Sequence, residues 1–365
     1  MLLIWADSRW RDSFGLALLS HELDNLGVEN MVVDFQMVPQ VMETVGEYIS
    51  GVVLNHTIGG RNRDIIRQTK KVGGSVFVIP TEGKPTPENE KWFYDNSTGY
   101  DRMFSWTNEF NPPKTAVTGS PRFQIYTDYR QFIDSRSVIS DKYRIAKGKR
   151  NIVFVSAYPQ AKFTYKNSLF NEQDWHDLKR TGAAKSAKQS MVEMAEFGRY
   201  IYNFADDDTN IILRPHPMED LLWWQQFQGN LFADTGHKSY LISQEYVFNL
   251  LSLADMWVTK KNCTTILDRR LYGGDSELLV FDGDGYDDDW ADDVVSSFDS
   301  AKEIAHIIAK ETRMKPVPLN RYLQVTHYLK AHNQVIFPSP NDTHVGKGVP
   351  MSVIGGWKQK LSKGD

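Results

Sequence analysis

The stretch Ile211-Ile212-Leu213-Arg214-Pro215-His216-Pro217 is a short apolar run that ends in a polar turn. A second run of this kind, Ala254–Thr259, leads into Lys261-Asn262-Cys263-Thr264-Thr265. Runs of this length are typical of buried strands in a parallel sheet, and ligands bind at the carboxyl ends of such strands. The first turn offers a cation and an imidazole. The second offers hydroxyl groups at the start of a helix, where free N–H groups favour an anion. The two turns therefore suit the phosphates and ribose of a nucleotide sugar.

Around these turns, apolar runs alternate with helical patterns in both halves of the chain, which predicts an α/β fold with doubly wound sheets. In the first half we expect strands at 2–6, 31–35, 51–54 and 75–79, with helices at 13–26 and 61–71. In the second half we expect strands at 151–156, 210–214, 255–259 and 277–281, with helices at 188–204, 243–253, 264–272 and 299–311. The stretch 80–125 is rich in Pro and Gly and is expected to be irregular, and the basic run 142–150 is expected to link two domains.

The second turn carries a family resemblance. Asn262-Cys263-Thr264-Thr265, with Asp268 and then Gly273 beyond, is similar to the Asn-Ser-Thr-Thr turn, acidic residue and glycine of GT-B glycosyltransferases that build bacterial surface carbohydrates. Those enzymes also carry the His-Pro motif. In the first half, Glu82-Gly83 and Gly119-Ser120-Pro121-Arg122-Phe123 extend the resemblance. Cysteine stands here in place of serine and aspartate in place of glutamate, so the exact donor is left open.

The resemblance implies two Rossmann-like domains facing a cleft. The N-terminal domain, 1–140, would bind the acceptor and carry the catalytic groups, and the C-terminal segment 319–365 would cross back onto it by a helix at 319–333. The second domain, 148–318, would bind the nucleotide sugar. A chain of 365 residues is long enough for two such domains.

The expected donor site lies in the second domain. His216 is fixed between two prolines and can donate to a phosphate or ribose oxygen, while Arg214 can pair with phosphate through two N–H groups. The alternative for this turn is a structural His-Pro turn in which Arg214 binds a local carboxylate. Thr265 and Asp268 have the spacing of a capping box, and Asp268 is equally suited to hold ribose hydroxyls. The other expected donor residues are Asn262, Thr264, Ser156 and Arg122.

The expected catalytic and acceptor residues lie in the first domain. Glu82 follows a predicted strand, and we take it as the first candidate for a base that deprotonates the acceptor hydroxyl. Asp7 and Asp12 follow the first strand, although N-capping explains Asp12 slightly better. Arg11 and His56 are expected to contact the acceptor, and His56 is a further candidate for the base.

The composition restricts the cellular compartment and the cofactors that we expect. The single cysteine, Cys263, excludes an intramolecular disulfide and indicates a reducing compartment, and the N-terminus lacks the pattern of a signal peptide. No window is apolar enough to span a bilayer, so we expect a cytoplasmic protein. The acidic run 282–289 does not have the spacing of a calcium loop, and we expect neither a metal nor a cofactor.

The resemblance implies a metal-independent glycosyltransferase that uses a CMP-, CDP- or UDP-linked sugar. Its acceptor would be a glycan or a lipid-linked precursor, and a transferase of CMP-activated sugars such as Kdo is one possibility that the resemblance opens. One alternative is a CDP-glycerol-type transferase of a phosphopolyol. Another is a phage-type glycosyltransferase acting on modified DNA bases, which the net charge of −4 disfavours because duplex binding relies on cations. A protein that only binds a nucleotide or a partner is a weaker alternative.

Overall fold

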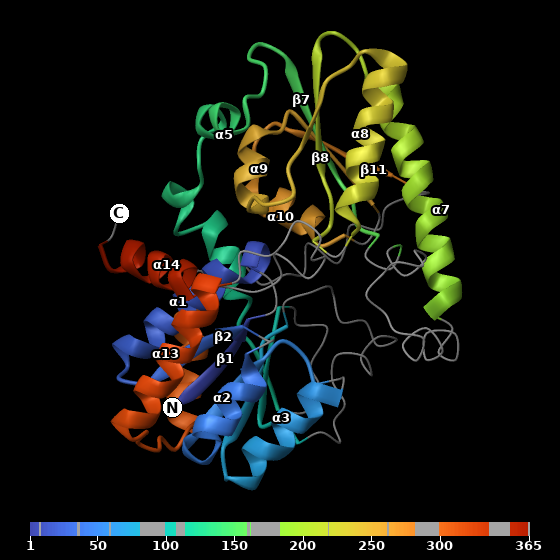
Figure 1. Cartoon of the computed structure of the whole chain (residues 1–365). Coiled ribbons are helices and arrows are strands. Elements are labelled where there is room, and N and C mark those ends of the chain that lie inside the picture. Colours follow the sequence, from blue (N-terminus) through green and yellow to red (C-terminus); the bar gives the residue numbers. More distant parts are fainter. Residues whose placement is uncertain are drawn as a thin grey trace. The chain divides into compact units, whose positions relative to one another are not determined.

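A computed structural model describes residues 1–6, 9–34, 37–57, 60–80, 99–106, 114–158, 161, 183–217, 219–260, 263–281, 299–335 and 351–363. These residues form two compact units, each built on its own parallel sheet (Figure 1). Met1–Phe132 and the three C-terminal helices make up the first unit. The second unit runs from Ile133 to the last strand.

The first unit contains a six-stranded sheet in the order β2-β1-β3-β4-β5-β6, in which all paired strands are parallel. Its strands are β1 (Leu2–Ala6), β2 (Asn30–Asp34), β3 (Gly51–Leu54), β4 (Ser75–Val78), β5 (Arg102–Ser105) and β6 (Thr115–Val117). Its α-helices are α1 (Arg9–Asn25), α2 (Val38–Val45), α3 (Gly60–Lys71), α12 (Ser300–Glu311), α13 (Leu319–Val335) and α14 (Met351–Lys363). The 3-10 helices η1 (Gly46–Tyr48), η3 (Pro121–Tyr126) and η4 (Arg130–Phe132) complete it.

The side chains of the first sheet are buried on both faces, as expected when helices cover both sides of a parallel sheet. One core joins alternate residues of β1 to β4, such as Leu3 and Val52, to α2, α3 and α13. On the other side, α1 packs against α12 and α14. The close approach of α1 to η3 requires Gly15, because a Cβ there would lie 2.6 Å from the backbone nitrogen of Arg122.

The second unit contains a five-stranded parallel sheet in the order β11-β10-β7-β8-β9. Its strands are β7 (Arg150–Val155), β8 (Thr209–Arg214), β9 (Ser239–Leu241), β10 (Met256–Lys260) and β11 (Glu277–Phe281). Its α-helices are α5 (Arg136–Tyr143), α7 (Ala183–Ile201), α8 (Leu221–Thr235), α9 (Val247–Leu253) and α10 (Thr265–Tyr272), and η6 (Tyr202–Phe204) extends α7.

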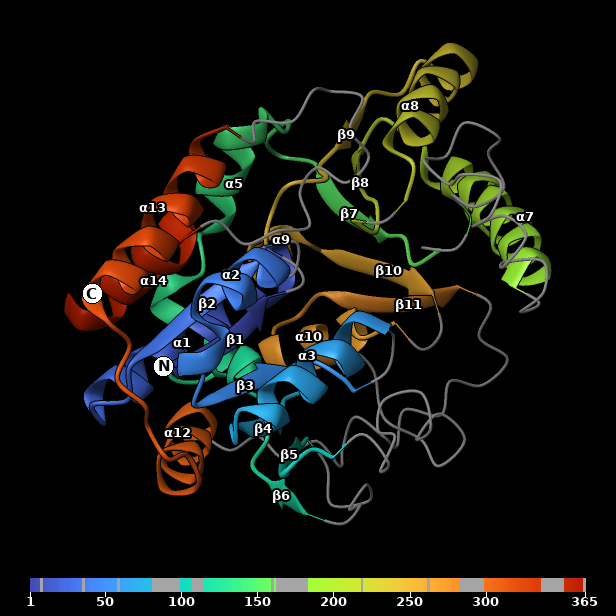
Figure 2. The same ribbon diagram turned by 60° about the horizontal axis from the view of Figure 1, so that its bottom comes forward.

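In the second unit, α7 and α8 cover one face of the sheet, and α9 and α10 lie on the other (Figures 1 and 2). The core under α7 and α8 contains Phe154, Phe197, Leu213 and Trp224, each almost fully buried. Alternate strand residues such as Trp257 face the opposite side and are buried as well. Burial on both faces explains why the three central strands β7, β8 and β10 are nearly continuous apolar runs.

The α/β class with two Rossmann-like parallel sheets is confirmed. Residues 80–125 are not irregular throughout, because β5 and β6 add two parallel strands to the first sheet. The expected linker 142–150 lies within the second unit: α5 ends there and packs against α9, and β7 begins at Arg150. Helix α12, which we expected in the second domain, packs against α1 and belongs to the first unit. Helix α13 packs against α2 in the same unit.

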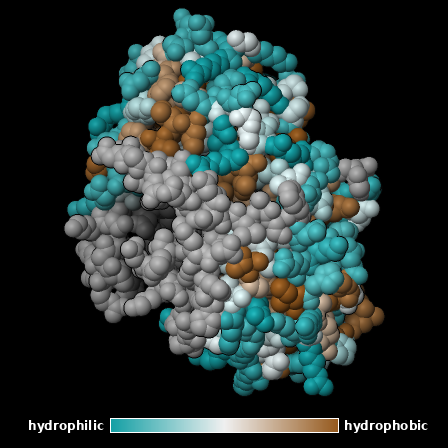
Figure 3. Space-filling view, turned by 180° about the vertical axis from the view of Figure 1, so that it is seen from behind, coloured by the Kyte–Doolittle hydropathy of each residue, from teal (hydrophilic) through white to brown (hydrophobic). Residues whose placement is uncertain are grey.

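Most large apolar side chains lie in these cores. The exposed ones are scattered and include Leu222 and Phe232 on α8 and Leu319 and Leu323 on α13. Figure 3 shows one face, on which hydrophobic residues form small patches in a largely hydrophilic surface. Among the described residues, no helix has both the length and the apolar character that a membrane crossing requires.

Candidate functional site

The strand order of the second sheet places a topological switch point between β7 and β10. From β7 the chain adds β8 and β9 on one side, and then returns to add β10 and β11 on the other. The helices that follow β7 and β10, α7 and α10, lie on opposite faces of the sheet (Figures 1 and 2), and in folds of this class ligands bind at the carboxyl edge of such a switch point. Both signature turns of the sequence begin at this edge, after β8 and after β10.

A buried carboxylate, Glu219, holds the loops after β7 and β8 together. Its Oε1 accepts hydrogen bonds from the Ser156 hydroxyl (2.7 Å) and the Tyr158 N–H (2.5 Å). Its Oε2 accepts from the indole N–H of Trp224 (2.8 Å) and the N–H of His216 (3.3 Å). Burial raises the pKa of Glu219, and the four donors, which stabilise the carboxylate, oppose that shift. Glu219 thus fixes the backbone that follows β7 and the backbone that follows β8.

His216 lies at the start of this turn and is half-buried. Its carbonyl accepts a hydrogen bond from the N–H of Glu219 (2.9 Å), which closes the turn on itself. Together with the bond from the His216 N–H to the Glu219 carboxylate, this fixes the backbone from which the imidazole projects. The prolines on either side restrict it further.

Arg214 has a different environment from the one we expected. Its guanidinium is buried and donates to the carbonyl oxygens of Pro215 (2.8 Å), Ser243 (2.9 Å) and Glu245 (3.2 Å). Burial lowers the pKa of Arg214 to about 10, although the nearby Glu245 carboxylate acts in the opposite direction. A buried guanidinium must find acceptors within the protein, and here it finds them in the loop before α9. Arg214 therefore supports that loop and does not present its N–H groups to a phosphate.

Ser156 is likewise used inside the protein. Its N–H donates to the carbonyl of Arg214 (3.0 Å), and its hydroxyl donates to Glu219, so the two groups that we expected to contact phosphate are both engaged. The residue is 2% exposed. Its role in the structure is to extend the β7–β8 pairing by one residue and to anchor Glu219.

The N-terminus of α10 lies directly after β10, beside the switch point. Thr264 is its N-cap residue and makes no side-chain capping hydrogen bond. The capping box that we expected from Thr265 and Asp268 is not formed, because Thr265 is already the first helical residue and its hydroxyl lies 3.5 Å from the Thr259 hydroxyl and 3.2 Å from Cys263 Sγ. Asp268 is buried in the first turn. The N–H of Ile266, the second helical residue, donates to the Cys263 carbonyl (3.1 Å), and at a helix start of this kind the dipole still favours an anion.

Lys260, the last residue of β10, adds a cation to this edge. Its ammonium forms an ion pair with Glu193 of α7 (2.5 Å) and lies 4.6 Å from the centroid of the Tyr158 ring. Tyr158 follows β7, and its N–H donates to Glu219. The side chain of Lys260 therefore reaches from the end of β10 to the residues that follow β7. Its side chain is 29% exposed.

The first sheet has its own switch point, between β1 and β3. His56 follows β3 at the carboxyl edge and is half-buried. The Asn62 side-chain nitrogen lies 2.6 Å from the His56 carbonyl oxygen and 2.9 Å from its Nδ1. Since a carbonyl only accepts, this atom is the amide NH₂, and Nδ1 must accept from it as well. Asn62 therefore holds the backbone and the ring of His56 at the carboxyl edge of β3, and the role of His56 as a base stays a prediction.

Three other predicted residues lie in the first unit. Asp12 and Arg11 are neighbours on α1, and the guanidinium of Arg11 pairs with both carboxylate oxygens of Asp12 (2.5 and 2.9 Å). Helix α1 begins at Arg9, so Asp12 lies within its first turn and is not its N-cap. Arg122 lies in η3, with its guanidinium 5.1 Å from the centroid of the Phe123 ring.

Asp7, Glu82 and Asn262 lie outside the described residues, as does the acidic run 282–289. Within the part of the chain that the structure describes, no group of His, Cys, Asp and Glu side chains could hold a metal ion.

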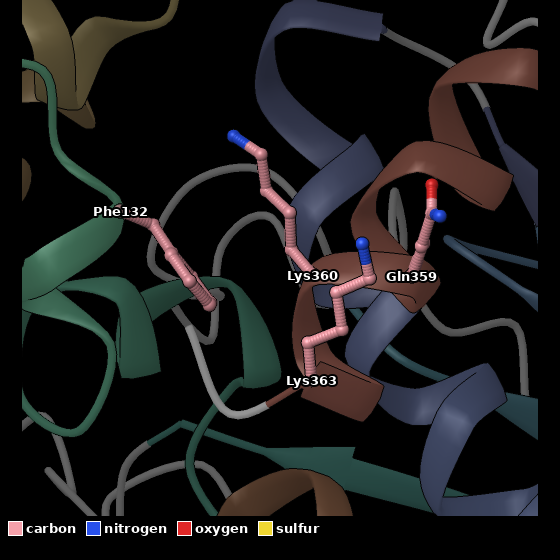
Figure 4. Close-up of a pocket in the computed structure, with 4 residues that line it drawn as sticks. All are labelled: Phe132, Gln359, Lys360 and Lys363. Atoms are coloured by element: carbon pink, nitrogen blue, oxygen red, sulfur yellow. The ribbon is translucent and has the colours of Figure 1, made fainter.

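A hollow of about 320 Å³ lies in the first unit, lined by Phe132, Gln359, Lys360 and Lys363 (Figure 4). The ammonium of Lys360 is 5.9 Å from the ring centroid of Phe132 and 4.9 Å from that of Trp357. None of the residues predicted from the sequence lines it. It is formed by α14 and the end of η4 and does not include a strand end of the first sheet.

Sequence reasoning missed Glu219, Tyr158 and Lys260. The sequence contained one indication of the role of Glu219: a carboxylate three residues after His216 can accept a hydrogen bond from the N–H of His216. Lys260 stood at the end of a predicted strand, but its partner Glu193 is 67 residues away in the chain.

No protein-family model matches the chain, and no curated protein matches it. Several solved structures are similar. A glycosyltransferase from Rickettsia africae aligns over 93% of this chain and 99% of its own, with 9% identity and a TM-score of 0.44. The wall teichoic acid polymerase TagF aligns over 100% and 89%, with 12% identity and a TM-score of 0.44. The UDP-GlcNAc 2-epimerase of Methanocaldococcus jannaschii aligns over 90% and 99%, with 10% identity and a TM-score of 0.49. Likenesses this distant leave the activity to be inferred from the site itself.

Proposed function

We propose that the chain is a GT-B glycosyltransferase that moves a sugar from a nucleotide-sugar donor to a hydroxyl of a glycan or lipid-linked acceptor in surface-carbohydrate synthesis. The second unit would bind the nucleotide, and the first would bind the acceptor and provide the base, with Glu82 as the first candidate. The reaction would need no metal, and the donor would be linked to CMP, CDP or UDP.

The observation that carries the proposal is the construction of the carboxyl edge at the β7–β10 switch point. There the uncapped start of α10 and the turn that carries His216 follow two of the three central strands, β10 and β8. A helix start suits a phosphate, and an imidazole on a rigid turn suits a phosphate or ribose oxygen. The Glu219 hydrogen bonds fix the His216 turn before any ligand arrives, which reduces the entropy lost on binding.

The test is thermal denaturation of the purified protein with CMP, CDP, UDP, GDP and dTDP, for the parent and for His216→Ala. A nucleotide at about 100 times its Kd adds about 2.7 kcal/mol to the unfolding free energy and so raises the Tm. We expect one nucleotide to stabilise the parent and to have a much smaller effect on His216→Ala. The matched control is His306→Ala, which removes an exposed imidazole from α12 and should leave the effect unchanged.

If no nucleotide stabilises the parent at millimolar concentration, the proposal is wrong. If one does, the corresponding sugar nucleotide is offered with glycan and lipid-linked acceptors, and the product is analysed for phosphorus. A product that gains a sugar without phosphorus supports glycosyl transfer. A product that gains phosphorus indicates transfer of a phosphopolyol instead.

A further inference from the structure

We infer that Lys260 binds the phosphates of the nucleotide donor, and that Glu193 is the counter-ion which the phosphates replace. This inference rests on the proposed function. It assigns the donor-phosphate role to a residue other than Arg214, which the sequence had suggested.

The position of Lys260 in the sheet is the first argument. It ends β10, one of the two strands that flank the switch point, and its ammonium lies over the ring of Tyr158, which follows the other strand, β7. The start of α10 follows five residues after Lys260. A phosphate at this helix start would therefore lie close to the carboxyl end of the strand that ends in Lys260.

The second argument concerns the hydrogen bonds of Arg214, the other cation at this edge. The hydrogen bonds of the Arg214 guanidinium go to backbone carbonyls, and its side chain is buried. Releasing it would leave three carbonyls without their donor and expose the loop before α9 to rearrangement. Lys260 can change its partner at lower cost than Arg214, because its side chain is partly exposed and its charged partner is a single carboxylate on a neighbouring helix.

The third argument is the nature of the Lys260–Glu193 pair. Burial alone would raise the pKa of Glu193, but the hydrogen bonds from Lys260 and Gln189 lower it overall, so the carboxylate is ionised at neutral pH. Both side chains are partly exposed, at 29% and 23%. A diphosphate carries more negative charge than one carboxylate and can replace it at the ammonium, while Glu193 gains hydration. Without nucleotide, the ion pair avoids an unpaired, partly buried cation.

The experiment compares a nucleoside, its monophosphate and its diphosphate as ligands in titration calorimetry, using cytidine, CMP and CDP and the corresponding uridine series. Lys260→Met keeps the apolar stem over Tyr158 and removes the charge. We expect it to weaken diphosphate binding by about tenfold or more and to leave nucleoside binding unchanged. Lys260→Arg should restore diphosphate binding to within about threefold of the parent, and Glu193→Gln should strengthen it, because the competing carboxylate is gone.

The matched control is Arg150→Met. Arg150 pairs with Glu277 (2.8 Å) at the amino ends of β7 and β11, the opposite edge of the same sheet, so this variant loses the same charge and a similar ion pair. It should bind all the ligands like the parent. Equal diphosphate affinity in Lys260→Met and the parent would overturn the inference, as would weaker binding in Glu193→Gln. A parent that binds none of the ligands would instead refute the proposed function. Melting curves identify any variant that is unfolded. If Lys260→Met is unfolded, the diphosphate affinities of Lys260→Arg and Glu193→Gln test the inference instead.

Discussion

At the scale of single residues, Glu219 is the group on which the donor edge depends most. It is a buried carboxylate that accepts from four donors, and none of these described partners is a cation. Glu219→Gln replaces one oxygen with an NH₂ group that must face N–H or O–H donors. We expect a loss of about 1–3 kcal/mol of unfolding free energy, which is the cost of a buried donor left without an acceptor. Urea denaturation of the parent and the variant measures this.

The control for this variant is Glu196→Gln on the exposed side of α7, which should change the unfolding free energy by less than about 0.5 kcal/mol. Glu219→Gln should also bind nucleotide more weakly even where it remains folded, since the N–H of His216 loses its acceptor. A variant as stable as the parent would show that the four hydrogen bonds do not hold the two loops together.

At the scale of elements, Asp255 joins α5 to the amino edge of the second sheet. Its carboxylate accepts two hydrogen bonds from Arg136 of α5 (2.6 and 2.7 Å) and one from the N–H of Asn151 in β7 (2.7 Å). The hydrogen bond with Arg136 holds the pKa of Asp255 below its ordinary value. A lowered pKa in the folded state contributes stability above the unfolded-state pKa of about 3.9, and that contribution is lost as the pH falls through the folded-state pKa.

We therefore expect Asp255→Asn to be less stable than the parent at pH 7, with the difference shrinking below about pH 4. The side chains are 44% and 35% exposed, so solvent screening limits the difference at pH 7 to about 1 kcal/mol. Urea midpoints measured between pH 3 and pH 7 test this. The control is Asp64→Asn, whose pair with Arg67 is more exposed, at 55% and 77%, and should contribute almost nothing. An Asp255→Asn difference that persists unchanged at pH 3 would contradict the ionic explanation.

The elements that the sequence predicted well are the apolar strands. The runs 2–6, 51–54 and 277–281 became β1, β3 and β11 with the expected bounds, because continuous apolar runs between turns have few other structures available. Strands β5 and β6 were missed because they are three or four residues long and lie among Pro and Gly. Helix α5 was missed because its polar surface resembles a linker, and its stability comes from α9 and from Asp255.

The site was predicted less completely than the fold, and for a physical reason. The sequence located the turns after β8 and β10, since strand ends can be read from local pattern. It could not show that Arg214 turns inward or that Glu219 joins Ser156, because those contacts connect residues 29 to 63 positions apart. Such contacts depend on strand order, which the local pattern does not contain.

At the scale of the whole molecule, each unit has its own hydrophobic core, and we expect the two cores to be stabilised separately. Phe197 of α7 is fully buried in the second unit, with ring centroids 5.3 Å from Phe281 and 6.2 Å from Phe154. Phe77 of β4 is equally buried in the first unit and stacks on Phe104 at 6.3 Å. Each Phe→Ala substitution should cost about 3–5 kcal/mol through lost burial and the cavity it leaves.

Hydrogen exchange measured by mass spectrometry shows which of the two units loses stability. Phe197→Ala should accelerate exchange in peptides from β7, β8 and β10 and leave those from β1, β3 and β4 close to the parent. Phe77→Ala should do the reverse, so each variant is the control for the other. Faster exchange across both sheets in either variant would mean that the chain unfolds as one cooperative body. Separate responses would mean that a nucleotide bound at the second sheet raises the stability of that unit in particular, because ligand binding stabilises the cooperative unit that contains the site.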